Sequence, residues 1–421
     1  MNVRRRSSAA ALAAIAVIGA AAPAVAADPS PSAPSGKSGG TDGLYGSADP
    51  QYDGVWRQSL ALLAQDTAGV IPSSSAVKWL TDQQCDNGAF APFRADPAKA
   101  CDAKTMVDTN STAAAVQALW AVGGHGDAVE EALGWLKSVQ NADGGWGYTP
   151  GSPSEANSTS VVIGALAATE TDPGTVKKGG KSPYDALLAA ALLCAGDGGA
   201  FGYPDQDGKP VANADATAAG VLGALGKGLV AEAGEKTADA TCTASDEPTR
   251  EQAAANGAAY LAGALAKDGH LTSALGGSAE QPDYGNTADA VVALAAQGGK
   301  DKAAKPLAWL EKNAAKWAGE SGPAAYAQLI LAAHATGTDP RDFGGTDLVA
   351  ALNATGPAPQ GVSAEDSATA SDEDGKAQKD QKDQNEDGDS GFGVWWFVGV
   401  CLVFGIGIGF LLSGRTKKQQ P

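Results

Sequence analysis

Histidine is scarce in this 421-residue sequence, with only His125, His270 and His334. None of them has a Cys or a carboxylate at the spacing of a zinc ligand set, and no Cys-x-x-Cys pair occurs among the five cysteines. A Gly-x-Ser-x-Gly elbow, the usual mark of a serine hydrolase on an α/β fold, is also absent. We therefore expect no metal site, no cofactor and no hydrolase of this type.

Basic residues are also in short supply. The chain has 30 Lys and Arg against 48 Asp and Glu, and a net charge of −18. Six of the basic residues lie at the two ends, so the body between them carries about −24. Such a body repels nucleic acid and anionic lipid surfaces and favours solubility. We expect no nucleic-acid partner.

The two ends are typical of an exported membrane protein. Three arginines, an Ala-rich apolar stretch and an Ala-Val-Ala pattern predict a signal peptide over residues 1–27. Residues 392–413 contain a long uncharged apolar run with aromatic residues near its edges and precede the basic tail 414–421. This pattern predicts a single transmembrane helix in the cell membrane, with the body outside the cell and the C-terminus in the cytoplasm.

The cysteine positions fit an oxidising compartment. Cys401 lies in the predicted membrane segment, and the remaining four cysteines allow three pairings. We expect Cys85–Cys101 and Cys194–Cys242, because each bond would staple a loop between neighbouring helices.

Composition divides the exported body into three parts. Residues 28–45 are rich in Pro, Ser and Gly and predict a flexible leader. Residues 356–391 are polar and acidic, which predicts a disordered stalk with a reach on the order of 30–35 Å. Residues 46–355 can form a large core, and their apolar residues recur at helical spacing between Gly-rich turns.

A turn motif recurs in this central region. Its two clearest copies share a Gln, a Gly and an aromatic residue at the same spacing: Gln84, Gly88 and Phe90, then Gln140, Gly144 and Trp146. Weaker copies begin at Asp197 and Asp268. The Gly provides the left-handed backbone that ends a helix, and the aromatic ring packs the turn on its neighbours.

A second motif opens the following helix. Its copies carry an Asn or Asp before an Ala-rich run, at Asn110, Asn157, Asp215 and Asn286. Asn and Asp are strong N-caps, so we expect these four side chains to cap helices.

The two motifs together define a unit of two helices that is repeated six times. The expected pairs are 52–66 with 75–84, 110–122 with 128–140, 157–169 with 183–195, 214–227 with 250–266, 286–297 with 301–315, and 323–336 with 345–353. Alternating helices of this kind predict an all-α fold, a double-layered α6/α6 toroid, with the first helix of each pair inside. The membrane helix would follow this α/α barrel.

The Gln-x-x-x-Gly-x-Trp/Phe turns and the Asp108-Thr-x-x-Thr-Ala helix start resemble the terpenoid cyclase and protein prenyltransferase superfamily, above all its squalene-cyclase-like repeat proteins. The likeness extends roughly over residues 50–355. It implies the toroid but no single function, because this fold hosts cyclases, prenyltransferases, thioester proteins and cobalamin carriers.

The catalytic signatures of that superfamily are altered or missing here. A class II cyclase needs an Asp-x-Asp-Asp acid, because an alkene is a very poor base. In the segment Asp108-Thr109-Asn110-Ser111, an amide stands where the proton donor would be, and Asp215 is the only acid among the four aligned positions. The prenyltransferase zinc ligands and the Cys-Gly-Glu-Gln thioester sequence are absent.

These departures favour a binding protein without catalysis. The N-termini of the inner helices would meet at one rim, where partial positive charge gathers beside polar side chains: Asp108, Asn110, Asn157, Asp215 and Asn286. We expect this rim to hold a corrinoid, an isoprenoid-like molecule or a partner, near the membrane and a membrane transporter.

Two alternatives stay open: an atypical cyclase or prenyltransferase-like enzyme, and a surface scaffold or adhesion protein. A clustered acid in a cavity with aromatic walls would favour the enzyme. A wide polar mouth would favour binding, and a filled barrel centre would favour the scaffold.

Overall fold

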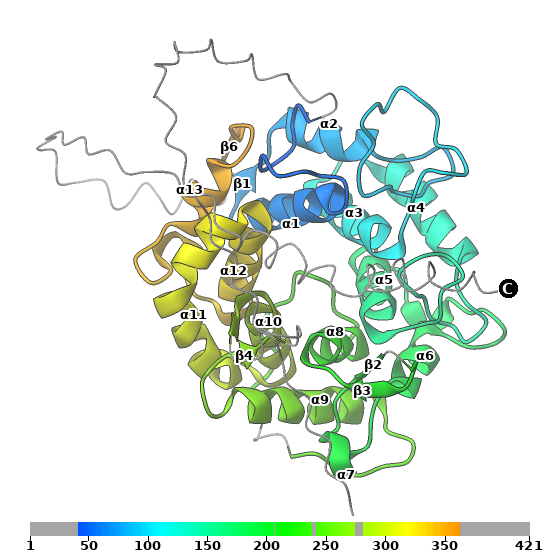
Figure 1. Ribbon diagram of the computed structural model, residues 1–421, viewed down its shortest axis with the longest axis vertical. Coiled ribbons are helices and arrows are strands. Elements are labelled where there is room, and N and C mark those ends of the chain that lie inside the picture. The colour runs from blue at the N-terminus through cyan, green and yellow to red at the C-terminus, as the bar shows by residue number, and fades with distance from the viewer. Residues whose placement is uncertain (1–40, 206, 238–240, 274–280, 363–421) are drawn as a thin grey trace, which may run out of the picture. The chain divides into compact units, whose positions relative to one another are not determined.

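The computed structural model describes residues 41–205, 207–237, 241–273 and 281–362. Within them, six helices form an inner ring (Figure 1): α1 (Gly54–Thr67), α3 (Thr109–Val122), α5 (Ala156–Ala168), α8 (Ala214–Ala224), α10 (Tyr284–Gly298) and α12 (Pro323–Thr336). The ring is closed, because each inner helix packs on the next and α12 packs on α1. Ala and Gly at the contacts let the helix backbones approach closely.

A second layer of helices surrounds this ring. Its members are α2 (Ser74–Asp82), α4 (Gly126–Ser138), α6 (Pro183–Ala189), α9 (Arg250–Leu265), α11 (Lys300–Ser321) and α13 (Leu348–Asn353). A short helix, α7 (Cys194–Asp197), and two 3₁₀ turns, Pro173–Thr175 and Pro340–Asp342, lie in the connections. The predicted α/α toroid is therefore confirmed, with the first helix of each pair inside.

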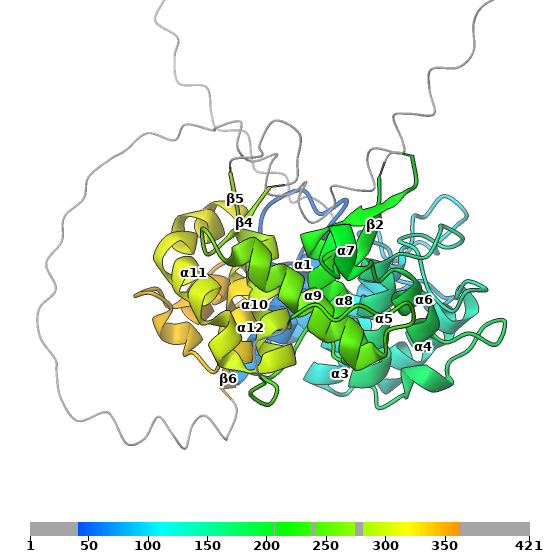
Figure 2. The same ribbon diagram turned by 90° about the horizontal axis from the view of Figure 1, so that it is seen from below.

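The toroid also contains short strands. Within the described residues they form three antiparallel pairs: β1 (Val70–Ile71) with β6 (Gly361–Val362), β2 (Gly202–Pro204) with β3 (Pro210–Ala212), and β4 (Leu271–Thr272) with β5 (Pro282–Asp283). The β2–β3 and β4–β5 hairpins rise from the same face of the ring (Figure 2) and lead into the N-termini of α8 and α10.

The helix pairs begin and end close to the expected residues, with α11 and α6 as the main exceptions. Helix α11 was expected to end at residue 315 but continues to Ser321. Helix α6 was expected to extend to residue 195 but ends at Ala189, because Ala191 instead forms a bridge with Phe201. This bridge places Phe201, the aromatic residue of the third copy of the turn motif, beside the end of α6.

The toroid extends beyond both expected boundaries. Leu44 and Tyr45 were assigned to the leader, yet both are buried, and the Tyr45 hydroxyl donates a hydrogen bond to Gln65 Oε1 at 3.1 Å. Residues 356–362 were assigned to the stalk. However, Gly356 lies against the Tyr45 ring, and β6 pairs with β1. The toroid therefore includes Leu44, Tyr45 and residues 356–362.

The membrane-related predictions concern other parts of the chain. The signal peptide, the membrane segment 392–413, the tail 414–421 and most of the leader and stalk lie outside the described residues. Within the described residues, no helix has the length and apolar character needed to cross a bilayer.

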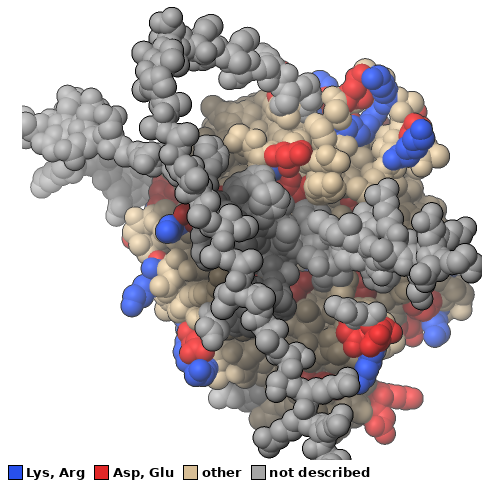
Figure 3. All heavy atoms as spheres, viewed as in Figure 1, with Lys and Arg blue, Asp and Glu red and all other residues tan. Residues whose placement is uncertain are grey.

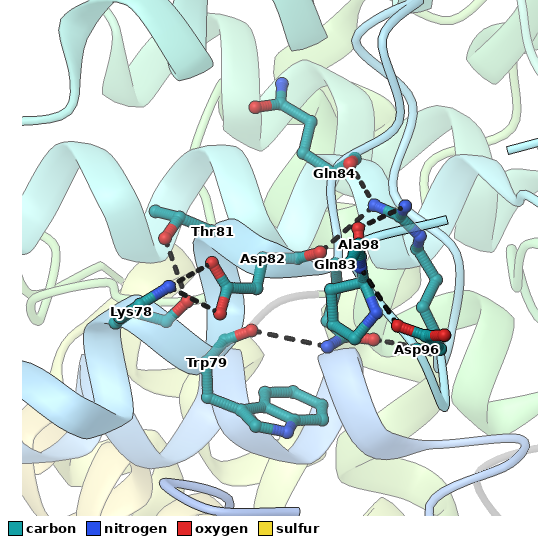
Figure 4. A network of polar contacts seen from close by, with 10 residues as sticks. Lys78, Trp79, Thr81, Asp82, Gln83, Gln84, Asp96 and Ala98 are labelled. Carbon is teal, nitrogen blue, oxygen red and sulfur yellow. Dashed lines mark hydrogen bonds and ion pairs between the residues drawn. The ribbon is translucent and has the colours of Figure 1, made fainter. Parts of the chain in front are cut away.

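Both expected disulfide bonds are present. Cys85 joins Cys101 across the loop that follows α2, and Cys194 of α7 joins Cys242 in the connection between α8 and α9. Polar contacts anchor the first of these loops at the end of α2 (Figure 4). There, the Gln83 side chain donates to the Trp79 carbonyl oxygen, and its Oε1 accepts from the backbone N–H of Arg94. The Arg94 guanidinium in turn donates to the carbonyl oxygens of Asp82 and Gln84.

The turn motif has the expected geometry. Gly88 and Gly144 have φ values of 88° and 90°, and Phe90 and Trp146 are buried. The motif Gln has a role that the sequence did not reveal. Gln140 Nε2 donates to the carbonyl oxygens of Gly144 and Val176, at 2.8 and 3.3 Å. Gln84 does the same with Gly88 and Ala128. Each Gln thus closes its own turn and ties it to the following repeat.

Candidate functional site

The N-caps of four inner helices lie two or three residues before the predicted positions. Asp108 caps α3, Glu155 caps α5, Asn213 caps α8 and Asp283 caps α10, each accepting a hydrogen bond from a backbone N–H of the first turn. The prediction that Asn110, Asn157, Asp215 and Asn286 are caps is therefore wrong. These four residues lie inside the first helical turn, where their side chains are free to face the centre of the ring.

A threonine in each of these helices fixes this register. Its Oγ1 accepts a hydrogen bond of 3.0–3.1 Å from the backbone N–H of a residue in the preceding turn: Phe90 to Thr112, Trp146 to Thr159, Phe201 to Thr217 and Leu271 to Thr287. When the helices are aligned on this threonine, Gly285 is equivalent to Asn110. The predicted alignment, which paired Asn286 with Asn110, was therefore shifted by one residue. The threonine was the sequence signal that could have corrected it.

A cavity of about 180 Å³ lies inside the ring, at the N-terminal half of the inner helices. We call it the inner cavity. Asn110, Asn157, Asp215 and Asn286 all line it, so the structure brings together four of the five predicted rim residues. The fifth, Asp108, is not among the described residues that line the cavity. It is completely buried, and its Oδ1 accepts from the Ser111 N–H at 2.6 Å.

The inner cavity has apolar and aromatic walls. Trp56 and Leu60 of α1 contribute, together with Val161, Leu222, Val292 and Leu331 from the other inner helices. Trp317 of α11 reaches the cavity from the outer layer. Its ring stacks on Tyr284, with centroids 5.4 Å apart, which fixes its orientation.

Carboxylates converge on the same cavity. Asp215 lines it together with Asp283, the N-cap of α10, and Asp289 of α10 itself. Asn157 Nδ2 donates to Asp215 Oδ2 at 2.6 Å, and Gln328 Nε2 lies 3.3 and 3.2 Å from the two Asp289 oxygens. Asp289 was missed in the sequence. It is the single charged residue in the second turn of an otherwise Ala- and Val-rich inner helix, and this was the available signal.

Burial makes these carboxyl groups weak acids. Burial raises the pKa of Asp289 to about 7, and the charges of Asp215 and Asp283 add to this effect against the Gln328 hydrogen bond. Burial also raises the pKa of Asp215 to about 6, although the Asn157 hydrogen bond lowers it. Burial raises the pKa of Asp283 as well. The cluster can therefore hold a proton near neutral pH.

Positive charge is nearly absent from this site. Among the described residues that line the inner cavity, Lys227 is the single cation, and its side chain is exposed. On the face in Figure 3, Lys and Arg side chains lie towards the outer edge of the described surface. Within the described residues, no group of His, Cys, Asp or Glu is arranged to hold a metal ion. The cavity therefore favours neutral or cationic groups over anions.

Comparisons with known proteins agree with this fold. Residues 51–187 match the family of the prenyltransferase alpha-alpha toroid domain. Drimenyl diphosphate synthase from Streptomyces showdoensis is 38% identical over 109 residues, a match that covers 24% of this chain and 19% of that protein. The chain thus matches about a fifth of the length of this relative.

Solved structures of terpene cyclases are also similar. ent-Copalyl diphosphate synthase from Streptomyces platensis has a TM-score of 0.45 and 15% identity, covering 68% of this chain and 50% of that one. The type II terpene cyclase MstE from Scytonema has a TM-score of 0.39 and 16% identity, covering 64% and 72%. The predicted resemblance is confirmed by the match of residues 51–187 to the prenyltransferase α/α-toroid domain family.

Proposed function

We propose that this protein is a cyclase-like enzyme that protonates the apolar end of an isoprenoid in the inner cavity. One observation carries the proposal: Asp215 and Asp289 converge in a cavity whose walls include Trp56 and Trp317. A clustered acid with aromatic walls was the feature expected to favour an enzyme over a binding protein.

Asp289 is the proposed proton donor. An alkene accepts a proton only from a carboxyl group that is still protonated when the substrate binds, and the raised pKa of Asp289 meets this requirement near neutral pH. The Asp289 proton passes to a carbon of the double bond and leaves a carbocation. A second double bond attacks this cation and closes a ring. A carboxylate of the cluster then removes a proton, so the overall reaction is an isomerisation.

The tryptophans have a defined part in this scheme. The face of an indole ring carries partial negative charge and attracts a cation within about 6 Å. Trp56 and Trp317 lie on α1 and α11, so the carbocation would have a ring from each helix in the walls around it. The stacking of Tyr284 on Trp317 keeps that indole in place as charge develops.

The charge and size of the inner cavity support an isoprenoid chain as the substrate class. A diphosphate inside the cavity would be repelled by the carboxylates of Asp215 and Asp283, so we place any charged end of the substrate outside. Pockets for drug-sized ligands are about 300–1,000 Å³. At about 180 Å³, the cavity suits the end of a hydrocarbon chain better than a corrinoid.

Capture without turnover is the second candidate function. It is supported by the buried Oδ1 atoms of Asn110 and Asn157 in the wall of the cavity, which have no hydrogen-bond partner among the described residues. A ligand with a hydrogen-bond donor would satisfy them. Attachment to the membrane and delivery to a transporter are further parts of this second proposal, and they rest on the sequence of the chain ends.

Product analysis of the full-length chain separates the two candidates. The protein would be incubated with geraniol, farnesol, geranylgeraniol, squalene and the matching diphosphates, and the products identified by gas chromatography and mass spectrometry. We expect a cyclic isomer from the wild type and from Asp127→Asn, a matched change at an exposed residue of α4. Asp289→Asn should give none. A thermal shift with a ligand but no product would favour capture, and product from Asp289→Asn would exclude this proton donor.

A further inference from the structure

We infer that residues 227–237, in the connection between α8 and α9, enter the ring, form the floor of the inner cavity and set the length of apolar chain that the cavity accepts. The inference rests on the proposed isoprenoid substrate. It assigns specificity to Leu229 and a positioning role to Gln117.

The connection turns into the ring directly after α8. Gly226 has a φ of 66°, and its N–H donates to the Gly223 carbonyl oxygen at 2.9 Å, which ends the helix. The next three residues, Lys227, Gly228 and Leu229, line the inner cavity. These three residues lie at the end of the cavity opposite the first helical turns, which carry the polar residues. They therefore close the deep end of the cavity.

Gln117 holds this segment in place. It lies in the middle of α3 and is 3% exposed. Its Oε1 accepts a hydrogen bond from the Leu229 N–H at 2.8 Å, while its Nε2 donates to the Val161 carbonyl oxygen of α5 at 3.2 Å. A single buried amide thus joins two inner helices to the floor.

The floor fits against the helices without spare room. A Cβ atom at Gly228 would lie 2.3 Å from Gln117 Oε1, and a Cβ atom at Gly164 of α5 would lie 2.6 Å from Gly228 Cα. Both positions require glycine for this approach. Interiors packed this closely transmit small changes in volume, so a change at Leu229 should alter the depth of the cavity.

Further contacts fix the segment beyond Leu229. The Gly234 N–H donates to the Ala295 carbonyl oxygen at 2.9 Å, and the Thr237 N–H donates to Gly298 at 3.3 Å, both at the end of α10. The connection therefore crosses from α3 and α5 to α10 and is held on both sides of the ring. It is a fixed floor rather than a loop that closes over a ligand.

The position of the floor gives a length for the bound chain. Asn157 and Gly164 are seven residues apart on α5, which corresponds to a depth of about 10 Å. An extended chain advances about 1.2 Å per bond, so an isoprene unit of four bonds covers about 5 Å. The cavity thus accepts about two isoprene units, and the floor determines which double bond lies beside Asp289.

Substitutions at Leu229 test the inference. In the full-length chain, Leu229→Ala should deepen the cavity and Leu229→Trp should make it shallower, with Leu193→Ala as a matched change at an exposed leucine. Dissociation constants would be measured by calorimetry for geraniol, farnesol and geranylgeraniol, which have two, three and four isoprene units. We expect Leu229→Ala to shift the preference by about tenfold towards farnesol, as burial of two further methylenes would give. Leu229→Trp should weaken geraniol binding by at least a similar factor.

Binding and product formation fail independently in this design. A shift in chain-length preference without any product would uphold the floor and contradict the proposed enzyme. If product forms but both folded Leu229 variants keep the chain-length preference of the wild type, the inference about the floor alone is contradicted. If no alcohol binds, both the floor and the proposed enzyme are contradicted. Gln117→Ala should broaden the preference without lowering geraniol affinity as strongly as Leu229→Trp, because it loosens the floor without filling the cavity.

Discussion

Asp289 is the residue on which the proposed reaction depends, and its protonation gives a direct test. Turnover at limiting substrate should fall as the pH rises through about 7, because the donor loses its proton. Since the charge of Asp215 contributes to the raised pKa of Asp289, Asp215→Asn should move the falling limb to lower pH. The profile of kcat/KM against pH for the wild type and Asp215→Asn provides the measurement. A limb at the same pH in both proteins would contradict the coupling.

The same carboxyl group links stability to pH with a definite sign. Its pKa is raised from 3.8 in the unfolded chain to about 7 in the folded protein, so the folded state binds more protons between these values. The free energy of unfolding should therefore decrease as the pH rises from about 4 to about 7. Asp289→Asn removes this contribution and should flatten the decrease. Urea unfolding of the wild type, Asp289→Asn and the exposed control Asp127→Asn checks this prediction, and equal slopes would contradict it.

At the scale of single elements, a turn position can require glycine for two separate reasons: a left-handed backbone, and the close approach of a neighbouring repeat. Gly144 has a φ of 90°, and a Cβ atom there would lie 2.2 Å from the Ser182 carbonyl oxygen. Gly151 has a φ of 80° but open space around it. Gly151→Ala should cost about 1–2 kcal/mol, the penalty of a left-handed backbone. Gly144→Ala should cost about 1–3 kcal/mol more, because the neighbouring repeat must move.

Urea unfolding of these two variants separates the backbone term from the contact between repeats. Equal losses in the free energy of unfolding would mean that the approach of Ser182 is relieved without cost. Gly88 provides an independent copy of the comparison, because its Cβ atom would lie 2.2 Å from the Glu131 carbonyl oxygen.

The helices could be predicted because their signals are local. Ala-rich runs at helical spacing and the Gly turns occur within each repeat. The cap register could not be settled in this way, since Asp108 and Asn110 are both good caps and only the threonine bond to the preceding turn distinguishes them. The cavity floor leaves no local pattern at all. It depends on a bond between Gln117 and Leu229, which lie 112 residues apart.

The site shows the same division between local and distant information. Asn110, Asn157 and Asp215 were predicted because they recur with the repeat, whereas Asn286 lies one position from the equivalent residue. Asp289 has no counterpart in the other copies, and its meaning depends on Gln328 and Asp215, which approach it from neighbouring helices of the closed ring. A repeat identifies the shared scaffold, whereas the chemistry arises where one repeat departs from the others.

At the scale of the whole molecule, the two disulfide bonds constrain loops of different length. Cys85 and Cys101 are 16 residues apart, whereas Cys194 and Cys242 are 48 residues apart. If the bonds act mainly on the unfolded chain, loss of the longer loop should cost about 4 kcal/mol and loss of the shorter about 3 kcal/mol. The longer loop also contains the cavity floor, so its removal acts on two properties at once.

The paired variants Cys85→Ser/Cys101→Ser and Cys194→Ser/Cys242→Ser test this difference by urea unfolding without reductant. Both should be less stable than the wild type, and the second pair more so. Geraniol affinity provides the second readout. It should be kept in the first pair, and in the second it should weaken by less than in Leu229→Trp, because Gly234 and Thr237 still hold the floor to α10. If the second pair lost affinity as completely as Leu229→Trp, the bond at Cys242 rather than the contacts with α10 would be what fixes the floor.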